Sequence, residues 1–322
     1  MVSGTGHYLP ERILTNADWE KMVDTSDEWI ITRTGIRERH VAAPEEATSD
    51  LSTKAALSAL ENAGLAPEDV ELIIVGTVNP DMKFPSASVF VQHNIGSARA
   101  AAFDVGGACC GFLYSLTIAD ALIGTGVYKN AVVIGTEILT RMIDWTDRNT
   151  CVLFGDGSGA VVLEKSDGER GLLSSTLQSD GSLTHLLYYA AEGTRYGASH
   201  ETLDKGLHAM MMNGREVFKH AVRQMADSSI KAVEMAGLKP EDIDLLIPHQ
   251  ANIRIIDATA KRLGFGDDRV VVNIDKTGNT SSASIPIAMD QAHRAGRLQK
   301  GMNVLMTVFG GGLTWGAAVL KF

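Results

Sequence analysis

The sequence predicts an α/β protein made of two copies of one α/β unit. Short apolar segments alternate with longer segments of helical periodicity along the chain, which is typical of sheets covered by helices. A stretch of the first half is also repeated in the second half, and its matching residues keep a constant offset. Together these observations favour two packed halves over a string of separate domains.

The individual elements are predicted from their composition and from the residues that end them. Strands are expected where a short apolar run is bounded by Gly, Pro or polar residues, at 72–76, 131–135, 159–163, 245–248 and 304–308. Helices are expected where apolar residues recur at helical spacing, at 50–63, 110–123, 216–236 and 253–263. The stretch 181–213 is the least regular, and we expect a long loop or lid there.

The repeat is clearest where a helix passes through a turn into a strand. Residues 58–74 and 231–247 share the pattern Ala-Gly-Leu-x-Pro-Glu-Asp, in which Gly ends a helix and the turn leads into a buried strand. A second similarity follows in the same order, between 154–163 and 309–320. Chance likeness is the alternative, but the run of identities favours duplication. We expect the two halves to span residues 1–166 and 167–322.

The composition is that of an ordinary folded protein, and it narrows the possible partners. With 322 residues, of which 45% are hydrophobic and 21% charged, the chain can bury a large core. The net charge of −10 argues against general nucleic-acid binding. The sequence has no apolar run of the roughly 20 residues that a membrane span needs, and its first residues do not resemble a signal peptide. We therefore expect a cytoplasmic protein without nucleic-acid or membrane partners.

The three cysteines are expected to be free thiols, because Cys109 and Cys110 are adjacent and Cys151 has no partner. Their spacing predicts no metal site. Cys109 follows Asp104-Val-Gly-Gly-Ala, which predicts a strand end and a tight turn before a helix. The amides of a helix N-terminus would stabilise a thiolate and lower its pKa. The alternatives are that Cys109 is a core residue or that Cys110 is the reactive thiol, while Cys151 lies in an apolar segment typical of the core.

Two more polar residues occur where a site could form. His249 follows the strand expected at 245–248, and Asn279 lies in a Gly-Asn-Thr-Ser-Ser loop that enters a helix. Two neutral donors beside a thiol suit a thioester carbonyl and the enolate of a decarboxylating carbon–carbon condensation. Alternatively, His249 is a core histidine and Asn279 a turn residue. The glycines 310–312 lack the Lys-Ser/Thr of a phosphate loop.

Several motifs, in this combination and order, resemble those of the β-ketoacyl-acyl carrier protein synthase III family, the condensing enzymes that initiate type II fatty acid synthesis. They are Asp24-Thr-Ser-Asp-Glu-Trp-Ile-Ile-Thr-Arg, the Cys109 segment, Phe154-Gly-Asp-Gly, Pro248-His-Gln-Ala-Asn, Gly278-Asn-Thr-Ser and Phe309-Gly-Gly-Gly. The resemblance covers almost the whole chain. It implies a thiolase-like fold, in which two α/β halves pack as five layers αβαβα, usually in a homodimer.

The resemblance also implies a role for each reactive residue. Cys109 would be the nucleophile that an acyl-CoA acylates. His249 and Asn279 would polarise the malonyl thioester carbonyl and stabilise the enolate left by carbon dioxide. The backbone amides of Cys109 and Gly311 would form the oxyanion hole. The reaction would be ping-pong, with acyl-CoA and malonyl-acyl carrier protein as substrates, a 3-oxoacyl product and no cofactor.

Other residues match binding sites of the family. The positions that match CoA contacts are Thr25, Trp29, Arg33, Arg148 and Asn252. Phe84 and Phe309 match residues of the acyl pocket, and Phe84 matches the one that reaches across the dimer. Lys219, Arg254 and Lys261 match basic positions that dock the acidic carrier protein. Taken singly, each charged position could also be an ordinary surface residue.

Related enzymes are separated by their catalytic residues. A thiolase needs a second catalytic cysteine near the C-terminus, and none follows Cys151. An elongating synthase uses two histidines, whereas this chain offers Asn279. The alternatives are a condensing or acyl-transfer relative in specialised metabolism, or a non-catalytic scaffold that binds acyl carrier protein. Cys110 stands where a small residue is expected, and the longer stretch 181–213 leaves the acyl-chain preference open.

Overall fold

The computed structural model describes residues 1–166 and 168–322. Residue 167, where we expect the second half to begin, lies outside the described residues. The first main sheet has the strand order β1-β7-β6-β4-β5 and consists of β1 (Val2–Tyr8), β4 (Leu72–Gly76), β5 (Ala101–Val105), β6 (Asn130–Ile138) and β7 (Asp156–Glu164). The second has the order β11-β12-β13-β8 and consists of β8 (Gly171–Ser179), β11 (Leu245–Pro248), β12 (Asn303–Gly310) and β13 (Thr314–Lys321).

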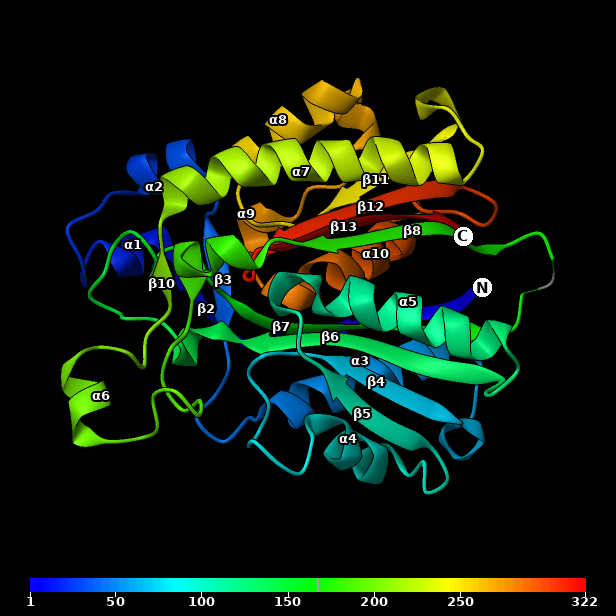
Figure 1. The fold of residues 1–322 in the computed structure, drawn as a ribbon, viewed down its shortest axis with the longest axis horizontal. Coiled ribbons are helices and arrows are strands. Elements are labelled where there is room, and N and C mark those ends of the chain that lie inside the picture. The colour runs from blue at the N-terminus through cyan, green and yellow to red at the C-terminus, as the bar shows by residue number, and fades with distance from the viewer. Residues whose placement is uncertain (167) are drawn as a thin grey trace.

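The sheets and their helices form five layers (Figure 1). Helices α3 (Thr48–Ala63) and α4 (Ala87–Ile95) cover the outer face of the first sheet. Helix α7 (Gly214–Met235) covers the outer face of the second sheet, with α8 (Ile253–Leu263) beside it. Helices α5 (Gly111–Gly124) and α10 (Ser284–Arg294) lie between the two sheets. This is the predicted αβαβα arrangement.

The predicted elements agree closely with the observed ones. The strands expected at 72–76 and 245–248 are β4 and β11, and the other three lie within β6, β7 and β12. The helix expected at 253–263 is α8, and the bounds of α3, α5 and α7 differ from prediction by at most two residues. Residues 2–8 and 171–179 form β1 and β8, although their mixed composition does not stand out as strand-like.

The repeated segments adopt the same local structure. Helix α3 ends at Gly64, with φ 68°, and α7 is followed by Gly237, with φ 70°. In each copy a short 3-10 helix built on Pro-Glu-Asp follows, and it leads into the buried strand β4 or β11. Glycine adopts the left-handed conformation at little cost, so it ends both helices at the same place.

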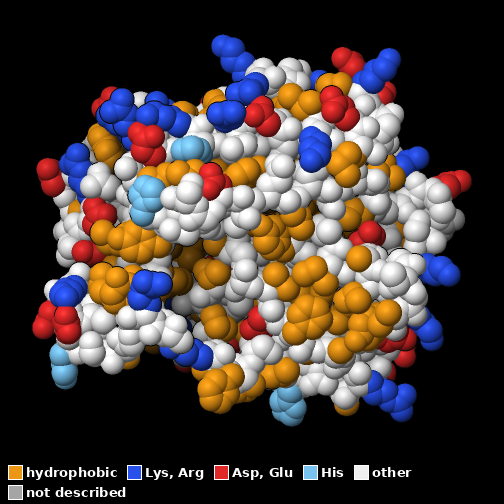
Figure 2. Space-filling view, viewed as in Figure 1, with side chains coloured by type: hydrophobic (Ala, Val, Ile, Leu, Met, Phe, Trp, Pro, Cys, Tyr) orange, Lys and Arg blue, Asp and Glu red, His pale blue; other side chains and the backbone are white. Residues whose placement is uncertain are grey.

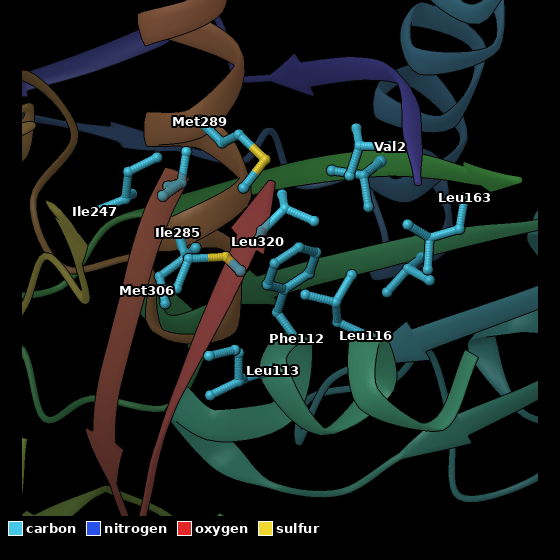
Figure 3. Packing of buried hydrophobic residues seen from close by; sticks show 14 of the residues in the cluster. Val2, Phe112, Leu113, Leu116, Leu163, Ile247, Ile285, Met289, Met306 and Leu320 are labelled. Atoms are coloured by element: carbon cyan, nitrogen blue, oxygen red, sulfur yellow. The ribbon is translucent and has the colours of Figure 1, made fainter. Parts of the chain in front are cut away.

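The middle layer holds a large apolar core (Figure 3). Phe112, Leu113 and Leu116 of α5 are buried and belong to the same cluster as Ile285 and Met289 of α10. Strands of both sheets close this cluster, with β7 on one side and β11, β12 and β13 on the other. Because α5 begins beside Cys109 and α10 begins beside Asn279, this core holds two of the candidate site segments against each other.

Smaller elements surround the layers. The remaining helices are α1 (Asn16–Trp19), α2 (Asp27–Thr34), α6 (His200–Asp204) and α9 (Ile274–Thr277), and the remaining strands are β2 (Arg12–Thr15), β3 (Glu38–Val41), β9 (Leu187–Tyr188) and β10 (Met211–Met212). The 3-10 helices are η1 (Pro67–Asp69), η2 (Ala108–Cys110), η3 (Leu139–Arg141), η4 (Gly181–Leu186), η5 (Pro240–Asp242), η6 (Asp267–Arg269) and η7 (Ser281–Ala283). The stretch 181–213 contains η4, α6 and a short antiparallel ladder between β9 and β10.

Candidate active site

Cys109 lies where β5 gives way to α5. The strand ends at Val105, the chain turns through Gly106 and Gly107, and Cys109 lies in η2, two residues before α5 begins. Ala108 has φ 45°, a left-handed conformation that non-glycine residues adopt only at a cost. Asp104 fixes the strand end, because its carboxylate accepts hydrogen bonds from the backbone amides of Ala87 and Ser88. The predicted strand–turn–helix around Cys109 is therefore observed.

The electrostatics of Cys109 differ from our expectation. We expected the helix N-terminus to lower the thiol pKa, but burial of the sulfur raises the pKa of Cys109 to about 11. The Ser281 hydroxyl, which lies 3.4 Å from Sγ, and the backbone amides of Cys109 and Gly311 act in the opposite direction, but they do not outweigh burial. The predicted effect of the backbone amides is therefore present, but burial of the sulfur outweighs it.

The other two cysteines lie apart from the candidate site. Cys110 is fully buried among the apolar residues of the middle layer, and burial raises its pKa. Cys151 is fully buried in a separate core next to Phe154. Among the described residues all three cysteines are free. Of the three thiols, the one that lines the main cavity is Cys109.

His249 directly follows β11 and is buried. Its backbone amide donates to the carbonyl of Thr307, which continues the pairing with β12. Ring atom Nδ1 lies 2.6 Å from the Ser284 hydroxyl at the start of α10. Ring atom Nε2 is buried and has no hydrogen-bond partner in the part of the chain that the structure describes. Burial lowers the pKa of His249 to about 3, so the imidazole is neutral at physiological pH.

Asn279 lies in the loop between α9 and α10. Its backbone is held on both sides, because its amide donates to the carbonyl of Leu153 and its carbonyl accepts from the amide of Gly155. The side-chain oxygen of Asn279 accepts a hydrogen bond of 2.9 Å from the amide of Ser281. This bond leaves the side-chain NH₂ group as the free donor, since Asn carries both functions. A donor is what a developing oxyanion or enolate requires.

The glycines that follow β12 allow the strand to approach Cys109. A Cβ atom at Gly310 would lie 2.8 Å from the Cβ of Cys109, which is closer than real side chains come. The next residue, Gly311, presents its amide to the sulfur of Cys109. The Phe-Gly-Gly-Gly sequence therefore acts as a close-packing element beside the thiol.

The three segments meet on one cavity of about 1390 Å³. The predicted site residues on its wall are Cys109, His249, Asn279, Gly311, Trp29, Arg33, Asn252, Phe309, Lys219 and Arg254. The stretch 181–213 also contributes to the wall, through Leu187, Tyr188 and Met212 among others. The face drawn in Figure 2 is hollowed close to β10, and hydrophobic side chains surround the hollow.

A second group of predicted residues forms a cationic and aromatic cluster at this cavity. The guanidinium carbons of Arg33 and Arg148 lie 5.6 and 5.0 Å from the ring centre of Trp29, within the range of a cation–π contact. Asn252 donates from its side chain to the carbonyl of Arg33 and caps α8 by accepting from the amide of Arg254. Thr25 lies outside the cavity wall, and its buried hydroxyl is unpartnered within the described residues.

Phe84, Arg148 and Lys261 do not line the cavity of this chain, whereas Lys219 and Arg254 do. The side chain of Phe84 is 84% exposed and stands away from the wall. Lys261 lies in the last turn of α8. Lys219 is held by Glu216 at 2.7 Å, and Arg254 lies over the ring of Phe218. Lys and Arg side chains gather near α2 and α8 in Figure 2, with Asp and Glu side chains among them.

Three contributing residues were missed from the sequence. Ser281 contacts the sulfur of Cys109, Ser284 contacts His249, and the buried Glu137 carboxyl lies 3.4 Å from the Ser281 hydroxyl. Both serines occur in a small polar segment typical of turns, so nothing marked them. Glu137 did offer a signal, because it is an acidic residue inside a wholly buried strand.

Comparisons with known proteins agree with this geometry. A family model described as 3-oxoacyl-[acyl-carrier-protein (ACP)] synthase III matches residues 103–181, and the model of its C-terminal part matches residues 233–322. The β-ketoacyl-[acyl-carrier-protein] synthase III of Caldanaerobacter subterraneus subsp. tengcongensis is 56% identical over 321 residues, which cover 100% of this chain and 97% of the relative. This chain belongs to the 3-oxoacyl-[acyl-carrier-protein] synthase III family.

Solved structures of the synthase family have the same fold. The crystal structure of 3-oxoacyl-[acyl-carrier-protein] synthase III from Aquifex aeolicus VF5 is 48% identical, with a TM-score of 0.92, and covers 100% of this chain and 99% of that one. The priming β-ketosynthase from the R1128 polyketide biosynthetic pathway is 36% identical, with a TM-score of 0.92, and covers 99% and 95%. The predicted family and the predicted thiolase-like fold are confirmed.

Two further observations concern binding. In residues 1–166 and 168–322 no helix combines the length and the apolar character that a membrane crossing requires. The same residues contain no group of three or more His, Cys, Asp or Glu side chains placed to hold a metal ion.

Proposed function

We propose that this protein is a 3-oxoacyl-acyl carrier protein synthase III, an acyltransferase that condenses an acyl-CoA primer with malonyl-acyl carrier protein. Family membership supports the reaction class. The observation that carries the assignment is that Cys109, His249 and Asn279 reach one cavity from three distant segments, with the amide of Gly311 at the sulfur. A nucleophile with neutral donors is what acyl transfer and enolate stabilisation need.

In the first half-reaction, the sulfur of Cys109 attacks the thioester carbonyl of the acyl-CoA. The backbone amides of Cys109 and Gly311 hold the oxyanion, and they already act on the sulfur in the free protein. The thiol proton leaves as the thioester forms, and CoA departs as the free thiol. Burial lowers the pKa of His249, so its imidazole stays neutral in this step, and the proton lost by Cys109 is balanced by the proton that the CoA thiol gains.

In the second half-reaction, malonyl-acyl carrier protein replaces CoA and loses carbon dioxide. The resulting enolate oxygen accepts hydrogen bonds from Nε2 of His249 and from the side-chain NH₂ of Asn279. Donation by Nε2 requires that Nδ1 accept a hydrogen bond, and the Ser284 hydroxyl at 2.6 Å can donate it. The enolate carbon attacks the acyl carbon on Cys109, the bond from this carbon to sulfur breaks, and the 3-oxoacyl product leaves while the released thiolate takes up a proton from water.

The carrier of each substrate also has a proposed place. We assign the adenine of CoA to Trp29, Arg33 and Arg148, whose stacked contacts can extend to a purine. Thr25 lies near them in sequence, and we assign Asn252, which lines the cavity and contacts the Arg33 carbonyl, to the pantetheine arm of CoA. Lys219, Arg254 and Lys261 form the proposed docking surface for the acidic acyl carrier protein. The acyl chain is assigned to the apolar wall that includes Phe309.

We further propose a homodimer. Strand β5 lies at the edge of the first sheet, and its residues are half-buried in one chain. A broad hydrophobic area covers β5 and α5 at the lower right of Figure 2. The exposed Phe84 would then fit against the acyl pocket of the partner, because a large aromatic side chain at the surface gains stability when covered. The duplicated halves, 1–166 and 167–322, and a cytoplasmic location with free thiols remain parts of this proposal.

The experiment that tests this function is a reconstituted condensation. The purified chain is mixed with a panel of acyl-CoAs and malonyl-acyl carrier protein, and the 3-oxoacyl-acyl carrier protein product and released carbon dioxide are measured. Formation of both in equal amounts supports the proposal. Absence of product with every primer would overturn it and would favour a scaffold that binds acyl carrier protein.

A second candidate is a priming synthase of specialised metabolism. The similarity to the R1128 priming β-ketosynthase and the lining residues contributed by 181–213 favour this possibility. The chemistry would be unchanged, and the primer would differ. Preference for a primer other than a short fatty acyl-CoA in the same assay distinguishes the two.

A further inference from the structure

Glu137 is a buried acid that the proposed reaction does not use. It lies near the end of β6 and is fully shielded from solvent. Its carboxyl group accepts hydrogen bonds from the Thr77 hydroxyl at 3.1 Å and from the Val78 amide at 3.3 Å. No Lys or Arg pairs with it within the part of the chain that the structure describes. A buried acid without a cationic partner is costly to ionise.

Ser281 connects this acid to the nucleophile. Its hydroxyl oxygen lies 3.4 Å from the Glu137 carboxyl and 3.4 Å from Sγ of Cys109. The backbone of Ser281 has φ 51°, in the left-handed region, and its amide is held by the Asn279 side chain. The loop therefore fixes the hydroxyl between two acidic groups. A hydroxyl carries one proton, so it can donate to only one of them at a time.

We propose that Glu137 is a positioning residue whose protonated form directs the single Ser281 proton to the sulfur of Cys109. When Glu137 is protonated, its own proton can be donated to the Ser281 oxygen, and Ser281 then donates to Sγ. When Glu137 is ionised, the carboxylate accepts the hydrogen bond of the Ser281 hydroxyl, and Cys109 loses this donor. The ionised form also adds a like charge near the sulfur, which opposes the thiolate.

Glu137 changes its protonation state slightly above neutral pH. Burial raises its pKa to about 8, while the donors Val78, Thr77 and Ser281 act in the opposite direction. The residues that face the carboxyl are Thr77, Val78 and Asn79 in the loop between β4 and α4, and Ser281 in η7. The titratable neighbour is Cys109 in η2. Glu137 and Cys109 therefore titrate as a coupled pair, in which ionisation of the acid hinders that of the thiol.

The test is the rate at which iodoacetamide alkylates Cys109, measured by mass spectrometry from about pH 6 to about pH 10 in wild type, Glu137→Gln and Ser281→Ala. Alkylation follows the thiolate fraction. In wild type we expect the logarithm of the rate to rise, flatten near the pKa of Glu137 and rise again. In Glu137→Gln, which cannot ionise, we expect an uninterrupted rise. A coupling of about one pKa unit makes this variant about tenfold faster than wild type near pH 9.

The Ser281→Ala variant distinguishes the effect of the Ser281 hydrogen bond from the repulsion between the Glu137 carboxylate and the Cys109 thiolate. Loss of the hydroxyl removes the donor in both protonation states, so we expect slower alkylation below the shoulder and only a weakened shoulder. Near-ultraviolet circular dichroism checks that each variant is folded, and Glu137→Ala, which also cannot ionise, is the substitute if Glu137→Gln is unfolded. A straight wild-type profile that matches that of Glu137→Gln would overturn the proposal. The inference relies on the proposed function only for the role of Cys109, and alkylation is measured without acyl substrates, so the two can fail separately.

Discussion

A single turn exposes the sulfur of Cys109 to the cavity and also shields it from bulk solvent. The left-handed Ala108 and the 3-10 helix η2 place the sulfur against the amide of Gly311, while Gly310 packs directly on its Cβ. Cys110, one residue later, faces the middle-layer core. The local pattern of small residues was enough to predict this turn. The burial of the Cys109 sulfur also depends on the glycine segment at 310–312, about 200 residues away, and the sequence could not show that this segment packs here.

Replacing Cys109 by Ser should abolish acyl loading while the fold is kept, because a hydroxyl at this position has no comparable nucleophile strength. Cys110→Ser is the matched control, since it changes the neighbouring thiol outside the cavity. We expect the control to load acyl groups and to lose some stability. Peptide mass spectrometry after incubation with acyl-CoA measures both. Loading of Cys109→Ser on residue 110 would contradict our choice of nucleophile.

Replacing Asn279 by Ala should impair condensation more than acyl loading, because the enolate forms only in the second half-reaction. Loss of one oxyanion-type donor costs roughly a hundredfold or more in rate. Asn279→Asp is the sharper control, since it keeps the oxygen that accepts from the Ser281 amide and lacks the NH₂ donor. We expect both variants to load acyl groups well and to condense poorly, as single-turnover measurements of each step would reveal. Equal losses in the two steps would argue against this role.

At the scale of elements, α2 and α8 come together through Gly35. This residue ends α2 with φ 81°, and a Cβ there would lie 2.6 Å from the Cβ of Ile253 at the start of α8. The contact places Trp29 and Arg33 of α2 beside Asn252. The sequence predicted α8 to the residue, but it could not show that these two helices meet, because their contact joins positions more than 200 residues apart.

Replacing Gly35 by Ala should destabilise the protein and raise the KM for acyl-CoA. Gly64→Ala is the matched control, because Gly64 also ends a helix in the left-handed conformation, while its Cβ would meet open space. We expect the control to lose about 1 kcal/mol of unfolding free energy and to keep its KM. Gly35→Ala should lose more than the control, since it adds a clash to the same backbone strain. Urea unfolding measures the stability of the two variants, and steady-state kinetics measures their KM values. Equal losses of unfolding free energy together with equal KM values would show that the contact between α2 and α8 is unimportant for acyl-CoA binding.

At the scale of the whole molecule, the internal repeat and the alternation of elements were enough to predict two halves and layered sheets. The family resemblance supplied the five-layer order, which comparison with solved structures confirmed. Sequence reasoning gave no bounds for β1 and did not predict β8, because edge strands have mixed composition and gain their stability from neighbours across the sheet. It also missed the buried polar network of Glu137 and Ser281, which exists only once the sheet and the α9–α10 loop are packed together.

Two buried ionisable groups, His249 and Glu137, should make the stability of the protein depend on pH in opposite directions. The folded protein holds His249 neutral, with a pKa near 3 against 6.5, so its contribution is present above about pH 6.5 and is lost as the pH falls toward 3. It holds Glu137 protonated, with a pKa near 8 against 4.5, so that contribution is present below about pH 4.5 and is lost as the pH rises toward 8.

Glu137→Gln should therefore gain stability over wild type as the pH rises from about 4.5 to about 8, by an amount on the order of a few kcal/mol. Gln cannot ionise, so it avoids the cost of a buried carboxylate. Urea unfolding of both proteins at several pH values measures the difference. A difference that stays constant across this range would show that Glu137 ionises freely in the folded protein.

The most direct measurement is intact-protein and peptide mass spectrometry of the wild-type chain after incubation with acyl-CoAs from acetyl to branched and medium-chain. The account predicts one acyl adduct, located on Cys109, which disappears when malonyl-acyl carrier protein is added. The preferred acyl group would also identify the primer class. An adduct on another residue, or no adduct with any acyl-CoA, would contradict the proposal that Cys109 carries the acyl group between the two half-reactions.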